Sequence, residues 1–366
     1  MKSCFTNKKP IVVMYYTYPN KVGGPLTYIN TLINSPLNQS YEFKTIFQNK
    51  APGGFDLALL RRMVKEIKKI RPDIVHVHGA QSEGFYGIIA SKLAGCKHIV
   101  MTVHGFAFDD SGCRGIKKFL YKHIVEPFSV HVADYVYCVC EYAAKRPIVT
   151  KHARKRKICY IHNPVSLDVP TISRKDMREQ LQCLDTDIVF CISGRVTKDK
   201  GFQILEEIVK RINKENIKNF KLLVIGDGDY FSEFSKNMSR EINNNQVIMV
   251  GQTNQVVNYL NASDAFLFPT YHENLSIALL EANAAGLACV VSDVGGNREI
   301  VEDGRNGFLL KEITSDAFFE KICVLINDNV TLKNMSENAK SIAEEKFGLS
   351  TICDKINEVY KECLQI

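Results

Sequence analysis

The sequence contains no uninterrupted apolar stretch of the roughly 18 residues that a membrane-spanning helix needs. It also lacks any Cys-x-x-Cys pair, although it holds 12 cysteines among 366 residues. In a chain of this length, cysteines without a regular framework indicate free thiols in a reducing compartment. A dinucleotide fingerprint of the Gly-x-Gly-x-x-Gly type is absent as well. These absences argue against a helical membrane span, a disulfide scaffold and dinucleotide binding.

The composition supports two domains, and its charge is unevenly distributed. With 45% hydrophobic and 24% charged residues, the chain can build two cores of ordinary size. Residues 1–163 hold 25 Lys and Arg and 10 Asp and Glu, which leaves 22 basic and 30 acidic residues of the totals of 47 and 40 for the rest. A first part at +15 and a remainder at −8 suggest an anionic partner for the first part, either a membrane surface or a nucleic acid. A lysine-rich solvated surface is the alternative.

Apolar runs alternate with amphipathic stretches along the whole chain. In the first half we expect strands at residues 11–18, 41–47, 73–78, 98–104, 135–140 and 158–162. In the second half we expect them at 188–193, 221–225, 247–250, 265–269 and 288–292. Helical periodicity fits residues 55–70 and the segment after Gly201. The alternation predicts an α/β fold with two successive doubly wound parallel sheets, each Rossmann-like.

The linker between the two sheets is expected at Asn163–Pro170, which is polar and contains two prolines. We therefore predict a first, basic domain at 1–165 and a second at 166–348. A terminal segment at 349–366 contains an amphipathic helix over Leu349–Leu364. Two sheets joined in this way are expected to face a central cleft, where closure could exclude water from a reactive intermediate.

A basic loop flanked by glycines follows the strand expected at 188–193. It runs from Gly194 to Gly201, carries Arg195 and Lys200, and precedes a helix. Anion sites combine cations with backbone amides at a helix N-terminus. Arg195 can hold two phosphate oxygens as a fork, and Lys200 adds a point charge. A basic surface loop is the alternative, but the place at the carboxyl end of a strand favours phosphate.

Glu273 and Glu281 lie eight residues apart in a strand, loop, helix and strand unit. The apolar helix expected after residue 276 contains Glu281, and a carboxylate on such a helix is costly unless something pairs with it. A salt bridge or a hydrogen-bonded core residue is the alternative to a ligand contact. Glu273 falls in the loop after the strand expected at 265–269, where parallel sheets bind ligands.

Glycine and histidine residues of the first half also follow expected strands. Gly23 and Gly24 come after the first strand and would let backbone approach a phosphate or sugar closely, with a plain turn as the alternative. His76, His78 and His104 lie at or near strand ends. No Cys/His spacing supports a zinc site, and an ordinary histidine of the core or of a strand end is the alternative for His76 and His98.

Residues 272–304 resemble the signature of the retaining GT-B glycosyltransferases, which use nucleotide sugars. The Glu-x7-Glu pattern of that family matches Glu273 and Glu281, and its Gly-Gly-x-x-Glu pattern matches the run that ends at Glu299. Its Gly-Arg-x4-Lys-Gly pattern matches residues 194–201, and the resemblance extends over the rest of the chain. It implies that the last helix crosses back to pack on the first domain.

The resemblance also implies roles for the candidate residues. Arg195 and Lys200 would bind the donor diphosphate and stabilise the charge that builds on the leaving nucleotide. Glu281 would accept hydrogen bonds from the ribose. Glu273 would orient the sugar hydroxyls, and the leaving phosphate would help to deprotonate the acceptor on the same sugar face. His104 would contact the transferred sugar.

Further donor contacts are implied by the loops around these residues. Backbone amides of Asn274, Leu275 and Ser276 would assist Glu273, and the Gly23-Gly24 loop would contact donor and acceptor. Gly226 and Asp227 belong to a Gly-Asp-Gly turn that is ordinary in the family after this strand. The sequence departs from the family at Tyr271-His272, where small residues are usual, and this affects the expected sugar contacts.

No metal or other cofactor is expected. Asp227-Gly228-Asp229 and Asp185-Thr186-Asp187 resemble the Asp-x-Asp metal ligands of the other glycosyltransferase fold. A single metal-dependent domain would need neither a second sheet nor the motifs around Arg195 and Glu273. We therefore predict a metal-independent enzyme.

The function predicted is transfer of a sugar from a UDP- or GDP-linked donor to a hydroxyl of a lipid-linked or oligosaccharide acceptor in surface polysaccharide synthesis. The alternatives are a nucleotide-sugar epimerase of GT-B architecture and a basic nucleic-acid-binding protein. The basic stretch lacks interleaved aromatic stacking groups, which weakens the last alternative. We expect a cytoplasmic protein, peripheral on the inner face of an anionic membrane. The cations that would bind it there are Lys117, Lys118, Lys122, Lys145, Arg146, Lys151, Arg154, Lys155, Arg156 and Lys157.

Overall fold

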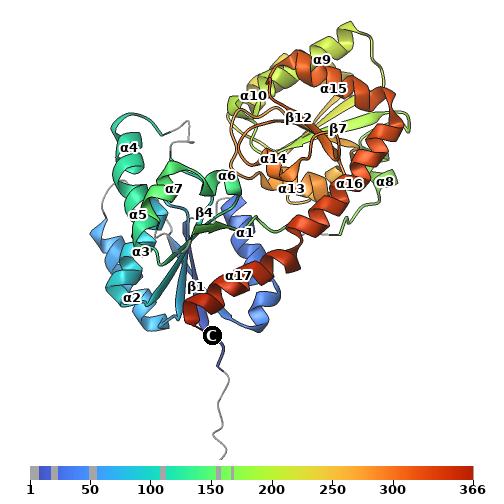
Figure 1. Ribbon diagram of the computed structural model, residues 1–366. Coiled ribbons are helices and arrows are strands. Elements are labelled where there is room, and N and C mark those ends of the chain that lie inside the picture. The colour runs from blue at the N-terminus through green and yellow to red at the C-terminus, as the bar shows by residue number, and fades with distance from the viewer. Residues whose placement is uncertain are drawn as a thin grey trace, which may run out of the picture. The chain divides into compact units, whose positions relative to one another are not determined.

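The computed structural model describes residues 8–17, 24–48, 56–107, 113–153, 158–165 and 169–365. It divides into two compact units (Figure 1). The first consists of residues 1–164 together with 349–366, and the second consists of residues 165–348. Each unit is built around one six-stranded parallel sheet, as the alternating pattern predicts.

The sheet of the first unit has the strand order β2-β1-β3-β4-β5-β6. Its strands are β1 (Ile11–Thr17), β2 (Glu42–Gln48), β3 (Ile74–His78), β4 (His98–Val103), β5 (Tyr135–Cys138) and β6 (Ile158–Tyr160). All six strands predicted for this half are confirmed, with ends that differ by one or two residues. β5 ends earlier than predicted because Cys140 is already the N-cap of the next helix.

The connecting helices of the first unit follow the strands in sequence order. They are α1 (Gly24–Ile33), η1 (Pro36–Gln39), α2 (Leu57–Ile70), α3 (Ser82–Ala94), α4 (Gly115–Leu120), η2 (Tyr121–Val125), α5 (Glu126–Val132), α6 (Glu141–Ala144), α7 (Pro147–His152) and α17 (Leu349–Leu364). The helix predicted at 55–70 is confirmed as α2. It begins after Asp56, whose side chain accepts from the Leu59 amide, and ends at Arg71 in the left-handed conformation.

The last helix of the chain completes the core of the first unit. Ile352, Ile356 and Tyr360 of α17 are buried with Val12 and Tyr28, which come from β1 and α1. The amphipathic pattern of this segment therefore buries its apolar side on residues some 300 positions earlier in the sequence. Packing of this kind, rather than helix propensity, supplies most of the stability of a helix in a folded domain.

The second unit repeats the scheme with the strand order β12-β11-β10-β7-β8-β9. Its strands are β7 (Ile188–Ser193), β8 (Phe220–Ile225), β9 (Val247–Gly251), β10 (Ala265–Phe268), β11 (Ala288–Ser292) and β12 (Gly307–Leu310). The five predicted strands are confirmed, whereas β12 was not predicted. It is a four-residue edge strand with three apolar residues after Gly307, too short a pattern to distinguish from a loop.

The helices of the second unit cover both faces of its sheet (Figure 1). They are α8 (Arg174–Gln180), η3 (Lys198–Lys200), α9 (Phe202–Lys214), α10 (Phe231–Asn237), α11 (Ser239–Asn243), α12 (Val256–Ala262), α13 (Ile277–Ala284), α14 (Asn297–Ile300), α15 (Ser315–Asn327) and α16 (Asn329–Phe347). The helix expected after Gly201 is α9, and the buried helix expected around Glu281 is α13.

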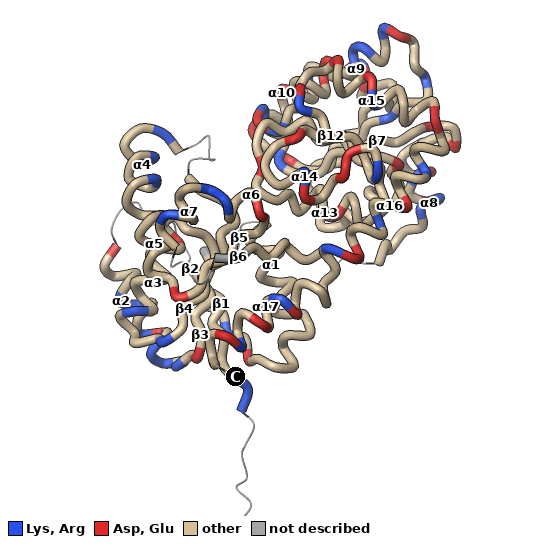
Figure 2. The backbone as a smooth tube through the Cα atoms, viewed as in Figure 1, with Lys and Arg blue, Asp and Glu red and all other residues tan. Residues whose placement is uncertain are grey.

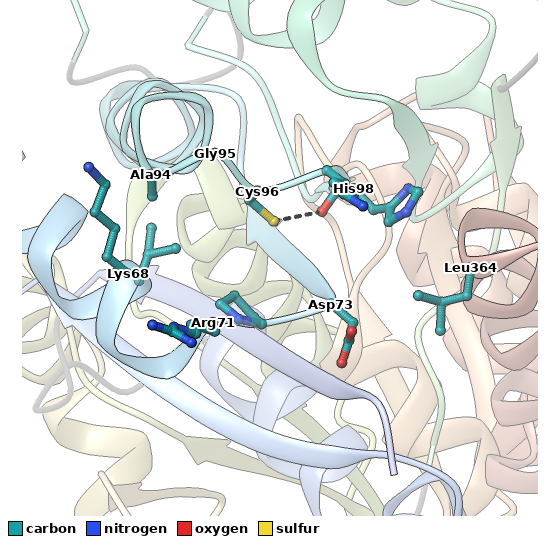
Figure 3. Close-up of a pocket in the computed structure, with 11 residues that line it drawn as sticks. Lys68, Arg71, Asp73, Ala94, Gly95, Cys96, His98 and Leu364 are labelled. Atoms are coloured by element: carbon teal, nitrogen blue, oxygen red, sulfur yellow. Dashed lines mark hydrogen bonds between the residues drawn. The ribbon is translucent and has the colours of Figure 1, made fainter. Parts of the chain in front are cut away.

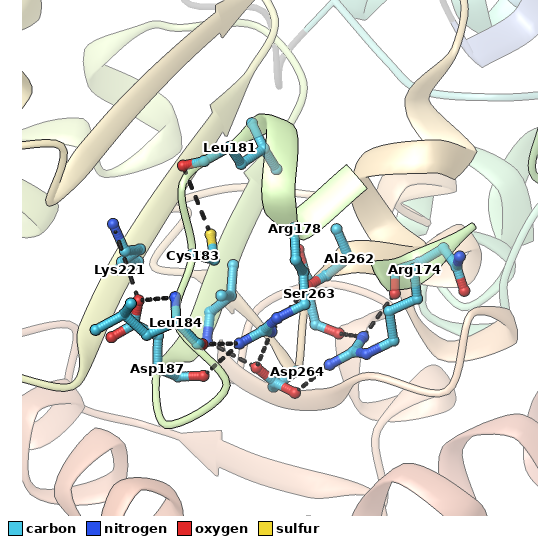
Figure 4. A network of polar contacts seen from close by, with 12 residues as sticks. Arg174, Arg178, Leu181, Cys183, Leu184, Asp187, Lys221, Ala262, Ser263 and Asp264 are labelled. Carbon is cyan, nitrogen blue, oxygen red and sulfur yellow. Dashed lines mark hydrogen bonds and ion pairs between the residues drawn. The ribbon is translucent and has the colours of Figure 1, made fainter. Parts of the chain in front are cut away.

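A polar network holds together the amino ends of two strands in the second unit (Figure 4). The guanidinium of Arg178 donates to the carbonyls of Leu184 and Asp187, each at 2.8 Å, and lies 3.2 Å from the Asp264 carboxylate. Asp264 also accepts from the Val189 amide at 2.8 Å and pairs with Arg174. Because these bonds lie where β7 and β10 begin, the network stabilises the edge opposite to the carboxyl ends.

Candidate active site

Four loops of the second unit meet at the carboxyl edge of its sheet. They follow β11, β10, β7 and β8, which are four consecutive strands of the parallel sheet. Open parallel sheets bind ligands at this edge. All predicted donor-binding residues of this unit belong to these loops or to α13, which follows one of them. The structure therefore carries Arg195 and Glu273, which are 78 positions apart, on loops at one edge of the sheet.

An ion pair joins two of the predicted site residues. The Lys200 ammonium donates to Oε1 of Glu273, and their side chains are only 14% and 15% exposed. The ammonium also lies 5.6 Å from the centre of the Phe268 ring. The carboxylate predicted to orient a sugar is thus in direct contact with the cation predicted to bind a diphosphate. The sequence suggested both residues but not their contact.

Backbone contacts fix the geometry of this pair. Gly201 has a φ of 79°, and a Cβ there would lie 2.0 Å from the carbonyl oxygen of Pro269. The Tyr271 amide donates to the carbonyl of Asp199 at 2.9 Å. The loop that carries Lys200 is therefore joined through its backbone to the loop that carries Glu273. Only glycine permits the approach at position 201.

The loop with Arg195 is braced by the next loop along the sheet. Gly226 has a φ of 135°, and a Cβ there would lie 1.9 Å from the carbonyl oxygen of Gly194. The Val196 amide donates to the Asp227 carbonyl at 3.1 Å. Arg195 itself is exposed, so its guanidinium is accessible to an anion. Gly226 and Asp227 thus help to fix the position of the basic loop through their backbone contacts with Gly194 and Val196.

The loop with Glu273 rests on the turn after β11. A Cβ at Gly295, which has a φ of 55°, would lie 1.8 Å from the Glu273 carbonyl oxygen. The Gly296 amide donates to the Asn274 carbonyl at 2.7 Å. The two glycines that the sequence marked as a turn therefore support the backbone of the candidate catalytic glutamate.

The remaining predicted residues of this loop lead into α13. Asn274, Leu275 and Ser276 are buried, and the Ser276 hydroxyl caps the helix by accepting from the Leu279 amide at 3.2 Å. A helix N-terminus presents amide groups that favour an anion or a hydroxyl oxygen. Glu281 lies five residues after Ser276 on α13, where it is half-buried.

The predicted sugar-contacting histidine lies in the first unit. His104 follows β4 directly, and its Nε2 is 3.3 Å from Nδ1 of His78. Burial lowers the pKa of His104 to about 3, so its imidazole is neutral near pH 7. A neutral imidazole can exchange hydrogen bonds with a hydroxyl, but it contributes no positive charge. Gly24 opens α1, while Gly23 lies outside the described residues.

His76 belongs to the core, as the alternative for this residue predicted. It is fully buried, and its ring nitrogens lie 2.6 Å from the hydroxyls of Tyr360 and Thr102. The hydroxyl of Tyr137 is 3.2 Å from Nε2, and that of Tyr28 bonds to Tyr137 at 2.8 Å. This network was not predicted. The available signal was the alternation in Val-His-Val-His, which places His76 and His78 on one face of β3.

Neither Asp-x-Asp triplet belongs to a cluster of metal-binding side chains. Among the residues that the structure describes, no group of three or more His, Cys, Asp or Glu could hold a metal ion. Asp227 and Asp229 are exposed, and the Asp227 carboxylate accepts from the Gly228 amide at 2.7 Å. Asp187 is buried before β7 begins, where it accepts from the Leu184 amide.

A pocket of the first unit that was not predicted lies at the amino-terminal edge of its sheet (Figure 3). It has a volume of about 580 Å³, and its lining includes Lys68, Arg71, Asp73 and His98. The last two residues lie where β3 and β4 begin, and Asp73 accepts from the Ile11 amide at 2.7 Å. None of the predicted site residues lines this pocket. None of the described helices is long and apolar enough to cross a membrane.

Comparisons with known proteins bear on the family and the fold of the chain. Residues 173–342 match the family model of glycosyl transferases group 1, and residues 35–169 match that of glycosyltransferase family 4. The UDP-Gal:alpha-D-GlcNAc-diphosphoundecaprenol alpha-1,3-galactosyltransferase of Escherichia coli is 31% identical over 310 residues, which are 83% of this chain and 79% of that protein. The capsular polysaccharide biosynthesis glycosyltransferase CapM of Staphylococcus aureus is 25% identical over 316 residues, 85% of this chain and 82% of that protein.

Among solved structures, Anabaena Alr3699/HepE in complex with UDP superimposes with a TM-score of 0.78 at 19% identity. The match covers 96% of this chain and 100% of that one. Two parallel-sheet α/β domains with such neighbours define the GT-B class of glycosyltransferases, so the predicted fold class is confirmed. The chain belongs to the group 1 glycosyltransferase family, with a family 4 region before the group 1 region. It is therefore an enzyme, a glycosyltransferase of the hexosyltransferase type, and the relative CapM is named for capsular polysaccharide biosynthesis.

Proposed function

We propose that the enzyme is a retaining glycosyltransferase that moves a sugar from a UDP- or GDP-linked donor to a hydroxyl of a lipid-linked or oligosaccharide acceptor. The Lys200–Glu273 pair at the carboxyl edge of the second sheet carries this proposal. It places a cation for a diphosphate against a carboxylate for sugar hydroxyls, which is the combination that a nucleotide sugar requires. Exposed Arg195 supplies a second cation on the same edge.

The proposed chemistry depends on stabilising the leaving diphosphate. As the bond between sugar and phosphate breaks, negative charge builds on the phosphate oxygens, and Arg195 and Lys200 oppose it. Lys200 then divides its three donor hydrogens between the phosphate and Glu273. This keeps the carboxylate oriented, so that Glu273 accepts from the sugar hydroxyls. Glu281 is proposed to accept from the ribose.

Retention of configuration is proposed from the family pattern at Glu273 and Glu281. The acceptor hydroxyl attacks the anomeric carbon on the face that the diphosphate leaves, and its proton passes to the leaving phosphate. His104, neutral because of its low pKa, is proposed to hydrogen-bond to the transferred sugar. Gly23, Gly24 and the amides of residues 274–276 remain proposed donor contacts.

The acceptor is proposed from the chemistry of the relatives. The Escherichia coli relative is named for a diphosphoundecaprenol-linked acceptor, and the Staphylococcus aureus relative is named for capsular polysaccharide biosynthesis. A lipid-linked acceptor would hold the enzyme at a membrane, and the +15 charge of residues 1–163 suits an anionic inner face. We propose peripheral association there, in surface polysaccharide synthesis.

The test begins with a panel of UDP- and GDP-linked sugars in thermal-shift measurements. The donor that raises the melting temperature most is then incubated with undecaprenyl-diphosphate-linked N-acetylglucosamine, and free nucleotide is measured with and without this acceptor. Release that depends on the acceptor, together with an α-linked product by NMR, supports the proposal. Conversion of the donor to its epimer without acceptor would support the epimerase alternative instead. A tight, salt-sensitive complex with nucleic acid and no response to any donor would support the binding protein.

A further inference from the structure

A helical run at the edge of the first unit exposes an unusual number of large apolar side chains. α4, η2 and α5 follow one another without a break over residues 115–132. α5 anchors the run, because Pro127 and Val130 are buried and the helix contacts α3 and α7. No residue of α4 or η2 is buried. Figure 1 shows α4 projecting beyond α5 and α7.

The exposed side chains in this run are those that normally lie in a core. Ile116 is 74% exposed, Phe119 56% and Ile124 54%, and Leu120 and Phe128 are exposed as well. Short helices are marginal in water unless an apolar face packs against something. A contiguous exposed patch of this kind marks an interaction site. Within the described part of the unit, no side chain of α4 or η2 is buried, and the large apolar ones remain exposed.

Lysines alternate with these apolar residues and indicate what covers them. Lys117 and Lys122 are exposed on the same run, Lys118 is half-exposed, and the sequence from Ser111 to Val125 contains no Asp or Glu. Figure 2 shows the resulting basic stretch at α4. A second copy of the chain would bring like charges face to face in a symmetric contact. Anionic lipid headgroups complement the lysines, and the acyl region beneath them accepts the apolar side chains.

We propose that α4 and η2 form a membrane anchor that inserts Ile116, Phe119 and Ile124 into an anionic phospholipid bilayer, with Lys117 and Lys122 at the headgroups. This deepens the proposed membrane association and rests on that part of the proposed function. It differs from adhesion by charge alone, because burial of apolar side chains is not screened by salt. Binding therefore has a salt-sensitive component from the lysines and a salt-resistant component from the apolar residues.

The absence of tryptophan from the chain permits a direct test of insertion. Phe119→Trp in the full-length protein gives one fluorescent reporter on the run, and Leu184→Trp gives a matched control at a site in the second unit that is 66% exposed. With vesicles of phosphatidylglycerol and phosphatidylcholine, we expect a blue shift for Phe119→Trp and quenching by lipids brominated on the acyl chains. We expect neither effect for Leu184→Trp.

Cosedimentation separates the two components of binding. Phe119→Gln/Ile124→Gln should reduce vesicle affinity at 0.5 M salt by at least about tenfold, since two apolar side chains no longer enter the bilayer. Leu184→Gln/Val330→Gln removes two apolar residues of the second unit that are 66% and 70% exposed, and it should change nothing. Lys117→Gln/Lys122→Gln should weaken binding at low salt by about tenfold and leave the salt-resistant part intact.

Three outcomes would overturn the anchor. They are sedimentation of the Phe119→Trp protein without a blue shift, equal affinity of Phe119→Gln/Ile124→Gln and the wild type at 0.5 M salt, and self-association that this double variant abolishes. Stabilisation by UDP, measured by thermal shift, reports separately on the second unit. Insertion without any response to UDP or to the donor panel would leave the anchor standing and reject the proposed transfer. A thermal shift with a donor but no insertion into vesicles would reject the anchor and leave the proposed transfer standing.

Discussion

At the scale of single residues, the candidate site depends on a pair of opposite charges rather than on a lone catalytic group. Lys200 and Glu273 are mostly buried and bonded to one another in the structure. A pair of this kind is either a structural ion pair or a prepared binding site. A structural pair predicts that a variant loses stability, whereas a binding site predicts that it loses turnover. Substitutions that separate turnover from stability distinguish them.

The basic side chains should affect turnover. We expect Lys200→Ala and Arg195→Ala each to lower turnover about 10²-fold, because each removes a charge that opposes the developing negative charge of the leaving diphosphate. Lys198→Ala is the matched control, since Lys198 is an exposed cation on the same loop as Lys200. Its ammonium lies 3.4 Å from the Glu233 carboxylate. Initial rates at saturating donor measure the effect. Near-wild-type transfer by both variants would refute the anion site.

The two glutamates should act on different kinetic constants. We expect Glu281→Ala to raise the KM for the donor, since it removes hydrogen bonds to the ribose that are equal in ground and transition states. Glu273→Ala should lower kcat more strongly, because it aligns the sugar as the bond breaks. Steady-state kinetics with varied donor give both constants. If the variants lose only thermal stability and keep both constants, the two glutamates have a structural role.

The buried histidines should make the protein acid-sensitive. Burial lowers the pKa of His76 to about 3 and that of His78 well below its ordinary value of 6.5. Below pH 6.5 the unfolded chain binds protons that the folded state does not, so the free energy of unfolding falls by up to about 1.4 kcal/mol per pH unit for each histidine. Thermal unfolding at pH 7.5 and 5.5 should show this loss.

A variant separates the buried histidines from the other titrating groups. His76→Gln keeps a hydrogen-bonding side chain toward Tyr360 and Thr102 and should reduce the pH dependence of stability between pH 6.5 and 5. His131→Gln, at an exposed position, should leave it unchanged. The same pH dependence in all three proteins would show that other groups cause the acid sensitivity.

At the scale of elements, the loops after β7, β8, β10 and β11 hold the site through close backbone contacts. Glycines at 201, 226 and 295 all have positive φ, and each approaches the carbonyl oxygen of a neighbouring loop. The backbones of these loops are therefore in direct contact, so that a displacement of one loop shifts the loop beside it. Residues far from the reacting atoms can affect turnover through these contacts.

Gly295→Ala tests this coupling. Its Cβ would lie 1.8 Å from the Glu273 carbonyl oxygen, so we expect the loop to shift and turnover to fall by about 10²-fold. Gly304→Ala is the matched control, because Gly304 has a φ of 76° but no atom within 4 Å of its Cβ position. The control should cost only backbone strain, about 1 kcal/mol. Equal activity of the two variants would contradict the proposed role of the turn.

At the scale of the whole molecule, the enzyme is made of two parallel sheets that differ in charge and in their polar interiors. The first unit contains a buried His and Tyr network together with an exposed apolar and basic helical run. The second contains the acidic part of the chain and the Lys200–Glu273 pair. This division suits one unit that associates with an anionic surface and another that binds the donor.

Metal independence is expected of the complete enzyme. We predict that activity survives exhaustive EDTA treatment followed by desalting, because the proposed role of Arg195 and Lys200 is to supply the positive charge for the diphosphate that a metal ion supplies in other enzymes. The measurement compares rates before and after treatment, with and without added Mn²⁺. Complete loss of activity and rescue by Mn²⁺ would instead assign Asp227 and Asp229 to a metal site.

The sequence by itself determined the α/β class, eleven of the strands and the stretches that carry the candidate residues, because hydrophobic periodicity and glycine-flanked loops are local signals. It did not predict β12, whose apolar run has three residues. The proposed roles of the site residues remain predictions that depend on the experiments above. Their placement at the ends of strands was nonetheless visible in the chain order.

Only the tertiary structure decided which residues meet. Lys200 and Glu273 are 73 positions apart, and Tyr360 contacts His76 from the last helix, 284 positions away. No periodicity encodes such contacts, because they depend on strand order and on the register between loops. The exposure of Phe119 and Ile124 is likewise a tertiary property. Their spacing is compatible with an ordinary buried helix, and only the fold leaves these side chains exposed, since no described residue of α4 or η2 is buried.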